Sequence, residues 1–321
     1  MDWMDKLLYP LQWVVAWILA IFHEIFTAIG LPADNGWTWA LSIAGLTVVI
    51  RALLIPLFVY QIKSQRKMQL LQPQIQRLQA KYKGKKDQYS RQAMAEEQMN
   101  LFRDNKTSPW ASCLPLLVQM PIFFSLFRVI HNMPKVASGS IDAIGGFTQD
   151  LAIQAENSSV FGISLSATFQ DPGISVKLLT GVLIIIMAST MFITQKQMMA
   201  KNMTETAAAN PMMQSQKMLL YVMPLVFGIG GIYFPLGVLI YWLVSNTWTM
   251  AQQHTVIRNM PAPGSKAEKE MLERRARKGK TVQQPEIKGG SDAAGEQDAK
   301  PTGQGQRQQP VSKNRKKNKK R

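Results

Sequence analysis

One stretch of 24 residues, Trp37 to Tyr60, is apolar and long enough to cross a lipid bilayer as a helix. At 1.5 Å per residue such a helix spans about 36 Å, against a hydrocarbon core of about 30 Å. Arg51 lies inside this stretch, about 14 Å along the helix from Tyr60. An arginine keeps its charge, and an isolated charge at such depth costs at least about 2.5–3.5 kcal/mol. The rest of the fold must make this charge tolerable.

The other apolar segments offer no acidic partner for Arg51. Four of them are of comparable length and contain no aspartate or glutamate: 109–131, 174–195, 216–234 and 236–256. We therefore expect Arg51 to face water, polar side chains or backbone carbonyls in a water-filled cavity inside a helical bundle. The alternative is an arginine close to a helix end, bound by a lipid phosphate, since the thickness of the membrane is unknown.

Charged and apolar residues are separated along the chain. Its 321 residues include 37 Lys and Arg against 20 Asp and Glu, for a net charge of +17, and apolar residues gather in blocks between the charged ones. This is the pattern of a multi-span membrane protein. One cysteine, Cys113, and three histidines form neither a disulfide framework nor a metal-ligand cluster, and no phosphate-binding glycine loop occurs. We expect no cofactor, no metal and no enzymatic reaction.

An apolar segment at 7–29 precedes the first predicted span, and a turn at 31–36 connects the two. Its tryptophans and its polar interruptions, His23 among them, favour a helix lying in the membrane interface. A transmembrane span is the alternative, and a signal peptide is disfavoured because no clean cleavage site follows. Residues 1–36 are thus predicted to form an interfacial or additional membrane helix with its turn.

The segment 61–108 is polar and carries eleven Lys and Arg. Within it, apolar residues recur at alternating spacings of three and four, the heptad pattern of a helix–helix seam: Met68, Leu71, Ile75, Leu78 and Tyr82. A turn at 83–86 separates this helix from a second one, and Pro73 marks either a kink or the true start of the first. We expect a coiled-coil hairpin projecting from the membrane.

Three further segments connect or follow the predicted spans: the loop 132–173, the linker 196–215 and the tail 259–321. The tail is almost free of apolar residues and is predicted to be disordered, with RNA or anionic lipid as its partner. Its basic end consists of Lys313, Arg315, Lys316, Lys317, Lys319, Lys320 and Arg321. Because Lys and Arg concentrate in the hairpin and the tail rather than in the loop, the positive-inside rule predicts a cytoplasmic hairpin and tail.

The last predicted span, 236–256, contains two adjacent polar residues in its middle, Ser245 and Asn246. Such residues either form hydrogen bonds between membrane helices or contribute polarity to a groove. The sequence alone leaves both roles open.

Four stretches resemble the YidC/Oxa/Alb family of membrane protein insertases, and the bacterial, actinobacterial type in particular: TVVIRALLIPL (47–57), MQLLQPQIQRLQAKY (68–82), CLPLLVQMPIFFSLF (113–127) and FPLGVLIYWLVSNTWTMAQQH (234–254). Their order and spacing match as well. The chain shows neither the large periplasmic domain of the Gram-negative members nor an N-terminal lipobox cysteine. We therefore expect no lipid-anchored form.

The resemblance implies an all-α polytopic fold, in which five core transmembrane helices enclose a hydrophilic groove open to the cytoplasm and to lipid. The spans are 37–60 and the four acid-free segments named above. The family's intramembrane arginine falls on Arg51. By the same matching, the groove or its rim would include Thr47, Gln119, Met120, Phe123, Tyr241 and Trp242, with Ser245 and Asn246 as further candidates.

The implied function is insertion and folding of newly made membrane proteins in the bacterial cell membrane, alone or with the Sec translocon. The implied partners are nascent membrane proteins, the ribosome at the basic tail, signal-recognition targeting factors and anionic lipids, and the protein would act as a monomer without a small-molecule substrate. Two other functions explain part of the sequence. A transporter of an anionic solute would explain Arg51, and a membrane anchor for ribosomes or RNA would explain the tail.

Overall fold

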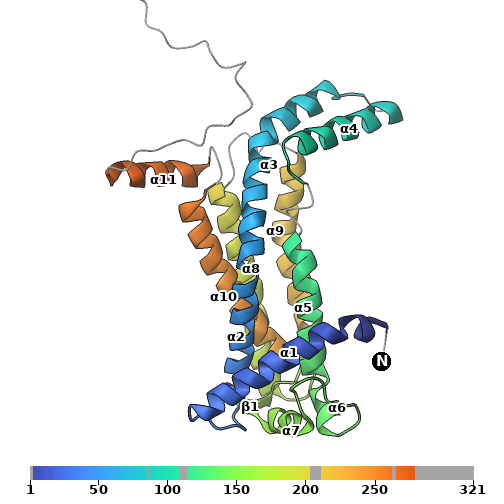
Figure 1. Ribbon diagram of the computed structural model, residues 1–321, viewed down its shortest axis with the longest axis vertical. Helices are drawn as coiled ribbons and strands as arrows, with labels where there is room; N and C mark the ends of the chain where they lie inside the picture. The colour runs from blue at the N-terminus through green and yellow to red at the C-terminus, as the bar shows by residue number, and fades with distance from the viewer. Residues whose placement is uncertain (1–2, 86, 109–113, 203–210, 262–264, 279–321) are drawn as a thin grey trace, which may run out of the picture. The chain divides into compact units, whose positions relative to one another are not determined.

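The computed structural model describes residues 3–278 except 86, 109–113, 203–210 and 262–264 (Figure 1). In chain order the elements are α1 (Trp3–Ala28), α2 (Gly36–Leu53), α3 (Ile55–Lys81), α4 (Gln88–Asp104), α5 (Leu114–His131), α6 (Met133–Ala137), α7 (Gln149–Asn157), β1 (Ser159–Val160), β2 (Ile163–Ser164), α8 (Ile174–Asn202), α9 (Pro211–Gly230), the 3-10 turn η3 (Gly231–Tyr233), α10 (Leu236–Asn259) and α11 (Lys266–Arg277). Cys113 and the basic end of the tail lie outside the described residues.

By length and composition, three of the described helices can cross a membrane: Lys6–Ala28, Gly36–Leu53 and Ile174–Ala200. Two shorter apolar stretches occupy Leu117–His131 and Leu220–Tyr233. Four of the five predicted core spans thus coincide with apolar helix. The fifth, α10, is a continuous helix whose second half is interrupted by polar residues such as Ser245 and Asn246.

Helix α1 packs on α2 and α5 and, in Figure 1, runs across them rather than beside them. One face of α1 is buried, with residues three or four apart: Leu8, Gln12, Val15, Ala16, Leu19, Ala20 and His23. The opposite face leaves Trp13 and Trp17 exposed. The helix continues through Pro10, and its length and crossing direction are compatible with both predicted placements.

The predicted first span is two helices rather than one. Helix α2 ends at Leu53, and α3 begins at Ile55 with Pro56 in its first turn. Proline lacks the N–H that would donate to the carbonyl four residues earlier, and its ring clashes with that carbonyl. The helix is therefore interrupted at Leu54. Because α3 then continues to Lys81, the first arm of the hairpin is the direct extension of the membrane segment.

Helices α3 and α4 form the predicted hairpin. Leu71 and Ile75 of the predicted seam are buried with Phe102 of α4, and Met68 packs at the edge of this cluster. Pro73 lies within α3 without ending it. Leu78 is partly buried.

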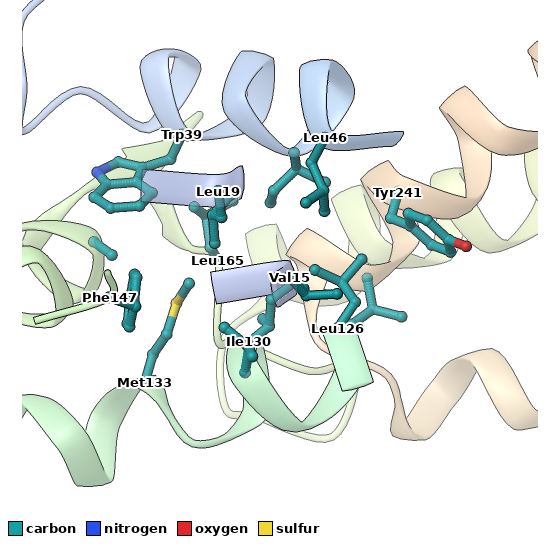
Figure 2. Close-up of a cluster of buried hydrophobic side chains, with 14 of the residues drawn as sticks. Val15, Leu19, Trp39, Leu46, Leu126, Ile130, Met133, Phe147, Leu165 and Tyr241 are labelled. Carbon is teal, nitrogen blue, oxygen red and sulfur yellow. The ribbon is translucent and has the colours of Figure 1, made fainter. Parts of the chain in front are cut away.

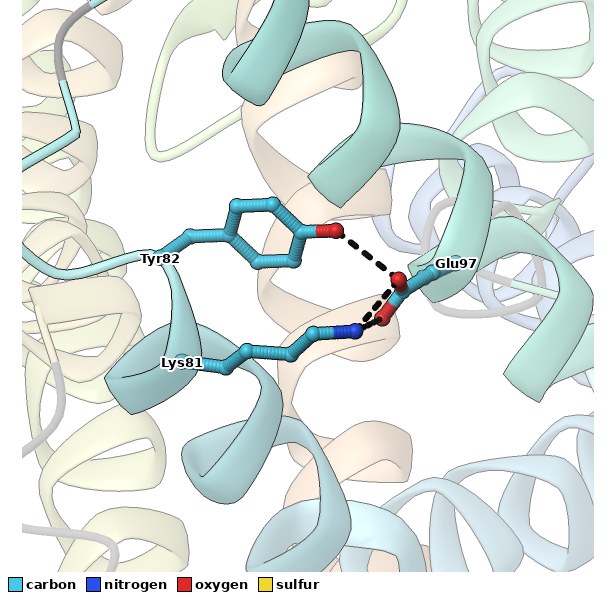
Figure 3. Close-up of polar contacts among 3 residues, drawn as sticks. All are labelled: Lys81, Tyr82 and Glu97. Carbon is cyan, nitrogen blue, oxygen red and sulfur yellow. Dashed lines mark hydrogen bonds and ion pairs between the residues drawn. The ribbon is translucent and has the colours of Figure 1, made fainter.

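Near the tip of the hairpin, the Lys81 ammonium lies 2.6 Å from a carboxylate oxygen of Glu97, and the Tyr82 hydroxyl donates to the same oxygen at 2.8 Å (Figure 3). The hydrogen bonds from Lys81 and Tyr82 lower the pKa of Glu97, and its carboxylate in turn raises the pKa of both partners. This network ties α4 to the end of α3.

The segment 132–173, predicted only as a loop, contains α6, α7 and an antiparallel pairing of β1 with β2. We call these residues the cap. Its apolar side chains join the main core, which also includes Trp39, Leu46 and Leu126 (Figure 2). The backbone N–H groups of Leu236 and Gly237 donate to cap carbonyls at 2.8 and 2.9 Å. The cap is therefore fastened to the start of α10.

The prediction of a tail disordered from residue 259 is wrong for its first part. Helix α10 reaches Asn259, and α11 follows after a short connection. The Ser265 side chain caps α11 by accepting the N–H of Glu268 at 3.3 Å, and Ala267 and Met271, one turn apart, are buried. Helix α11 contacts α8 and α10. The charged composition around its two buried apolar residues hides them in the sequence.

Candidate functional site

Arg51 belongs to the buried side of α2 and keeps only 9% of its surface exposed. One terminal nitrogen of its guanidinium donates to the Ser245 hydroxyl of α10, and the guanidinium carbon lies 5.7 Å from the centre of the Phe58 ring. Within the described residues Arg51 forms no ion pair and its Nε has no hydrogen-bond partner. Ser245 is thus a polar side chain that receives a hydrogen bond from this charged group.

Helix α10 presents a second polar group beside Ser245. Tyr241 lies one helical turn earlier, so both side chains share a face. The Tyr241 hydroxyl accepts a hydrogen bond from Nε2 of Gln119 on α5, and Figure 2 shows this hydroxyl pointing away from the apolar residues of the core. The Oε1 atom of Gln119 is buried and finds no partner among the residues described. We call Arg51, Gln119, Tyr241 and Ser245 the polar cluster.

Thr47 lies one turn before Arg51 on α2. Its side chain is 1% exposed, and its hydroxyl donates to the Ile43 carbonyl of the same helix at 2.6 Å. Its hydrogen-bonding capacity as a donor is therefore used within α2. Thr47 is a buried neighbour of the polar cluster.

The predicted aromatic rim is part of a larger ring cluster. The Trp242 ring centre lies 4.8 Å from that of Phe123 and 4.9 Å from that of Phe227, and Phe234 in the turn after α9 contacts both Phe123 and Trp242. Phe123 is buried, whereas Met120 and Trp242 are half-buried. Sequence reasoning missed Phe58, Phe227 and Phe234, since apolar periodicity does not distinguish lipid-facing rings from packed ones.

Asn246, although adjacent to Ser245, points to a different helix. Its side-chain nitrogen lies 3.4 Å from the Met187 carbonyl and 3.3 Å from the Thr190 hydroxyl, both on α8. Of the two roles left open by the sequence, the contact between helices is the one that this geometry supports.

The polar cluster combines a permanent cation with hydroxyl and amide groups drawn from three helices. Among its residues there is neither a nucleophile with a general base nor a set of metal ligands, and the described part of the chain contains no group of three metal-ligating side chains. Such a site can bind anionic or hydrogen-bonding groups and release them unchanged.

Comparison with known proteins identifies the family. Residues 31–263 match the family described as 60Kd inner membrane protein, which is more than half of the chain. The membrane protein insertase YidC of Streptomyces avermitilis is 43% identical over 270 residues, covering 81% of this chain and 60% of that protein. The YidC of Bifidobacterium longum is 37% identical over 319 residues, covering 97% and 95%. The chain belongs to the YidC family of membrane protein insertases.

Proteins of the YidC family are not enzymes, and they are multi-pass membrane proteins, which places this chain in a cell membrane. A crystal structure of an active YidC insertase with its first transmembrane domain resolved aligns with a TM-score of 0.45 at 24% identity, over 79% of this chain and 47% of that one. The chain spans about 60% of the length of its Streptomyces relative and nearly all of its Bifidobacterium relative.

Proposed function

We propose that the chain inserts newly made membrane proteins through a hydrophilic groove whose intramembrane floor is the polar cluster. The observation that carries the proposal is the state of Arg51: a buried guanidinium whose described partners are a hydroxyl and an aromatic ring, with one nitrogen unpaired. A structural arginine at this depth would be expected to be neutralised by a carboxylate. A charge left in this state is available to a passing chain.

The charge of Arg51 would make the groove prefer acidic substrate segments. A carboxylate about 4 Å from a cation gains about 1 kcal/mol in water but about 4 kcal/mol at an effective dielectric constant of 20. The acidic ends of a substrate that must cross the membrane would therefore be drawn towards Arg51. Gln119 and Tyr241 would supply hydrogen bonds to the hydrated backbone of the same segment.

Release would follow from burial of the apolar segment in lipid, worth about 25 cal/mol per Å² of apolar surface. Met120, and Trp242 of the ring cluster, are both half-buried, and they would contact a departing helix. Phe123, which packs against the Trp242 ring, would hold that ring in position. The five core helices would form the groove as a monomer, with α1 outside them.

The remaining partners follow from charge. We propose that the hairpin formed by α3 and α4 and the tail after α10 face the cytoplasm, where the hairpin would receive targeting factors or the Sec translocon. The tail would bind the ribosome or anionic lipid through its lysines and arginines. Family membership favours the insertase over the anion transporter and over the passive anchor, because neither alternative accounts for both Arg51 and the match over residues 31–263.

The test compares Arg51→Lys with Arg51→Glu in proteoliposomes supplied with ribosome–nascent chain complexes. Two single-span substrates are used that differ only in whether the translocated end is acidic or neutral. Arg51→Lys should retain most activity, since it keeps the charge. Arg51→Glu should lower insertion of the acidic substrate at least tenfold, corresponding to about 1.4 kcal/mol, while affecting the neutral one far less. Equal insertion of the acidic substrate by both variants would refute the electrostatic role.

Photo-crosslinking tests the path itself. Since Thr47 is buried, the half-buried Met120 is the better position for a photoreactive residue, and the exposed Ile185 of α8 is the control. With a stalled nascent chain, adducts at Met120 should follow the position of the emerging apolar segment. Adducts of equal yield at Ile185 would contradict a defined groove.

A further inference from the structure

The turn between β1 and β2 holds a bulky residue in an unfavourable backbone conformation. Phe161 and Gly162 form this turn, with φ angles of +55° and +77°. Two-residue hairpin turns with both central residues at positive φ normally contain Asn, Asp or Gly, because a side chain with a Cβ atom is crowded there. Gly162 fits this rule and Phe161 does not. The side chain of Phe161 must therefore supply something that offsets the backbone cost.

Phe161 is not held by the interior of the cap. Its side chain is 70% exposed, although its neighbours in the strands, Val160 and Ile163, are buried. Its ring contacts that of Trp37, at a centroid distance of 5.2 Å and an interplanar angle of 84°. This edge-to-face contact fixes where the ring lies without burying it.

Trp37 defines the depth at which the ring lies. It is the second residue of α2, a helix long and apolar enough to cross the membrane, and half of its surface is exposed. Tryptophan at the end of a membrane helix sits at the boundary between headgroups and acyl chains. The backbone of β1 also lies directly against Gly36, where a Cβ atom would approach the Val160 nitrogen to 2.7 Å. The strand is thus held at the level where α2 begins.

The surroundings of the turn suit the same boundary. The hairpin and its flanking residues, 157–165, contain no charged side chain. The cap leads directly into α8, whose first residue, Ile174, is 72% exposed. Two apolar helices, α2 and α8, therefore begin close to the cap with an exposed apolar residue each, Trp37 and Ile174. The uncharged hairpin with the exposed Phe161 lies beside the first of them.

We propose that the Phe161–Gly162 turn is a membrane anchor, which inserts the Phe161 ring into the interfacial region of the lipid leaflet at which α2 begins. The partner is phospholipid, contacted at its glycerol and upper acyl region. This role does not depend on the insertase mechanism proposed above. The anchor would fix the height of the cap, and through its hydrogen bonds to Leu236 and Gly237 the height of α10, relative to the bilayer.

The first experiment places p-benzoylphenylalanine at position 161 of the full chain, which keeps an aromatic ring there. The protein is reconstituted in nanodiscs of phosphatidylethanolamine and phosphatidylglycerol and irradiated, and its intact mass is measured by mass spectrometry. Gln170, an exposed residue of the same cap, is the matched control position. We expect phospholipid adducts at position 161 in at least fivefold higher yield than at position 170. Equal yields would overturn the proposal, as would adducts to another protein in place of lipid when native membranes are irradiated.

A second measurement uses spin-label accessibility in a Cys113→Ser background. Nitroxides are attached to Phe161→Cys and, separately, to Gln170→Cys. A label at 161 should collide several-fold more often with oxygen than with a water-soluble nickel complex, and the ratio should reverse at 170. Preferential collision with nickel at 161 would place the turn in water and overturn the proposal.

Discussion

Gly36 should tolerate no side chain, because the backbone of the cap occupies the space. An ideal Cβ at this position would lie 2.7 Å from the Val160 nitrogen and closer still to the Ser159 carbonyl. All of these atoms are backbone, so no flexible side chain can move aside. Gly36→Ala can be accommodated only if β1 moves away from the start of α2.

The size of the effect follows from this overlap. Adding a methyl group to a packed site costs about 1–3 kcal/mol, and the neighbours here are rigid, so the upper part of that range applies. With an unfolding entropy of about 2.1 cal/mol/K per residue, each kcal/mol lowers the unfolding temperature of a chain of 321 residues by about 1.5 °C, so a decrease of about 3–5 °C is expected. Ala is the better helix former, so helix propensity alone predicts the opposite sign.

Thermal unfolding in nanodiscs, followed by tryptophan fluorescence, measures this difference. Gly228→Ala is the matched control, because a Cβ at this position of α9 would lie 3.8 Å from that of Ala188 on α8, an ordinary contact between the two helices. The control should unfold at or slightly above the temperature of the unmodified protein. If Gly36→Ala behaves like Gly228→Ala, the packing of the cap against α2 is not as described.

Three further predictions concern single contacts. Because Lys81 and Tyr82 lower the pKa of Glu97, this carboxylate stabilises the hairpin above the unfolded carboxyl pKa of about 4.3, and its contribution is lost as the pH falls through the lower folded value. Hydrogen-exchange protection of α3 and α4 should fall over this acidic window, and Glu97→Gln should remove that dependence. Asn246→Leu should cost only about 0.6 kcal/mol, and in a double-mutant cycle with Thr190→Val the two changes should be less than additive. Ser265→Ala should remove about 1 kcal/mol of capping energy, seen as faster amide exchange confined to α11.

The sequence predicts best where a single helix carries the information. The depth of Arg51 and the lack of carboxylates in the other apolar segments follow from composition and a rise of 1.5 Å per residue. The seam of Leu71 and Ile75 follows from heptad spacing, and the structure confirms both residues as buried. In each case the relevant neighbours are within one helix or one hairpin.

Prediction from the sequence fails where a contact depends on segments that are far apart in the chain. Ser245, the partner of Arg51, lies 194 residues away in sequence, and many polar residues of the spans could have taken its place. The sequence predicts the cap only as a loop, because its strands have two residues each, too few to show the alternation of a strand. Its order comes instead from long-range contacts with Gly36 and the start of α10.

Asn246 and the polar cluster differ in how far their hydrogen-bonding groups are paired, which distinguishes a contact between helices from a candidate binding site. The side-chain nitrogen of Asn246 reaches two acceptors on α8, as expected of a residue that only joins helices. The polar cluster, in contrast, leaves Nε of Arg51 and Oε1 of Gln119 buried and unpaired within the described chain. Each such group costs about 1–3 kcal/mol. One is a donor and the other an acceptor, which are the two groups needed to bind a peptide backbone of any sequence. In the proposed groove, such a site would favour acidic segments through its charge and would bind other segments through their backbone.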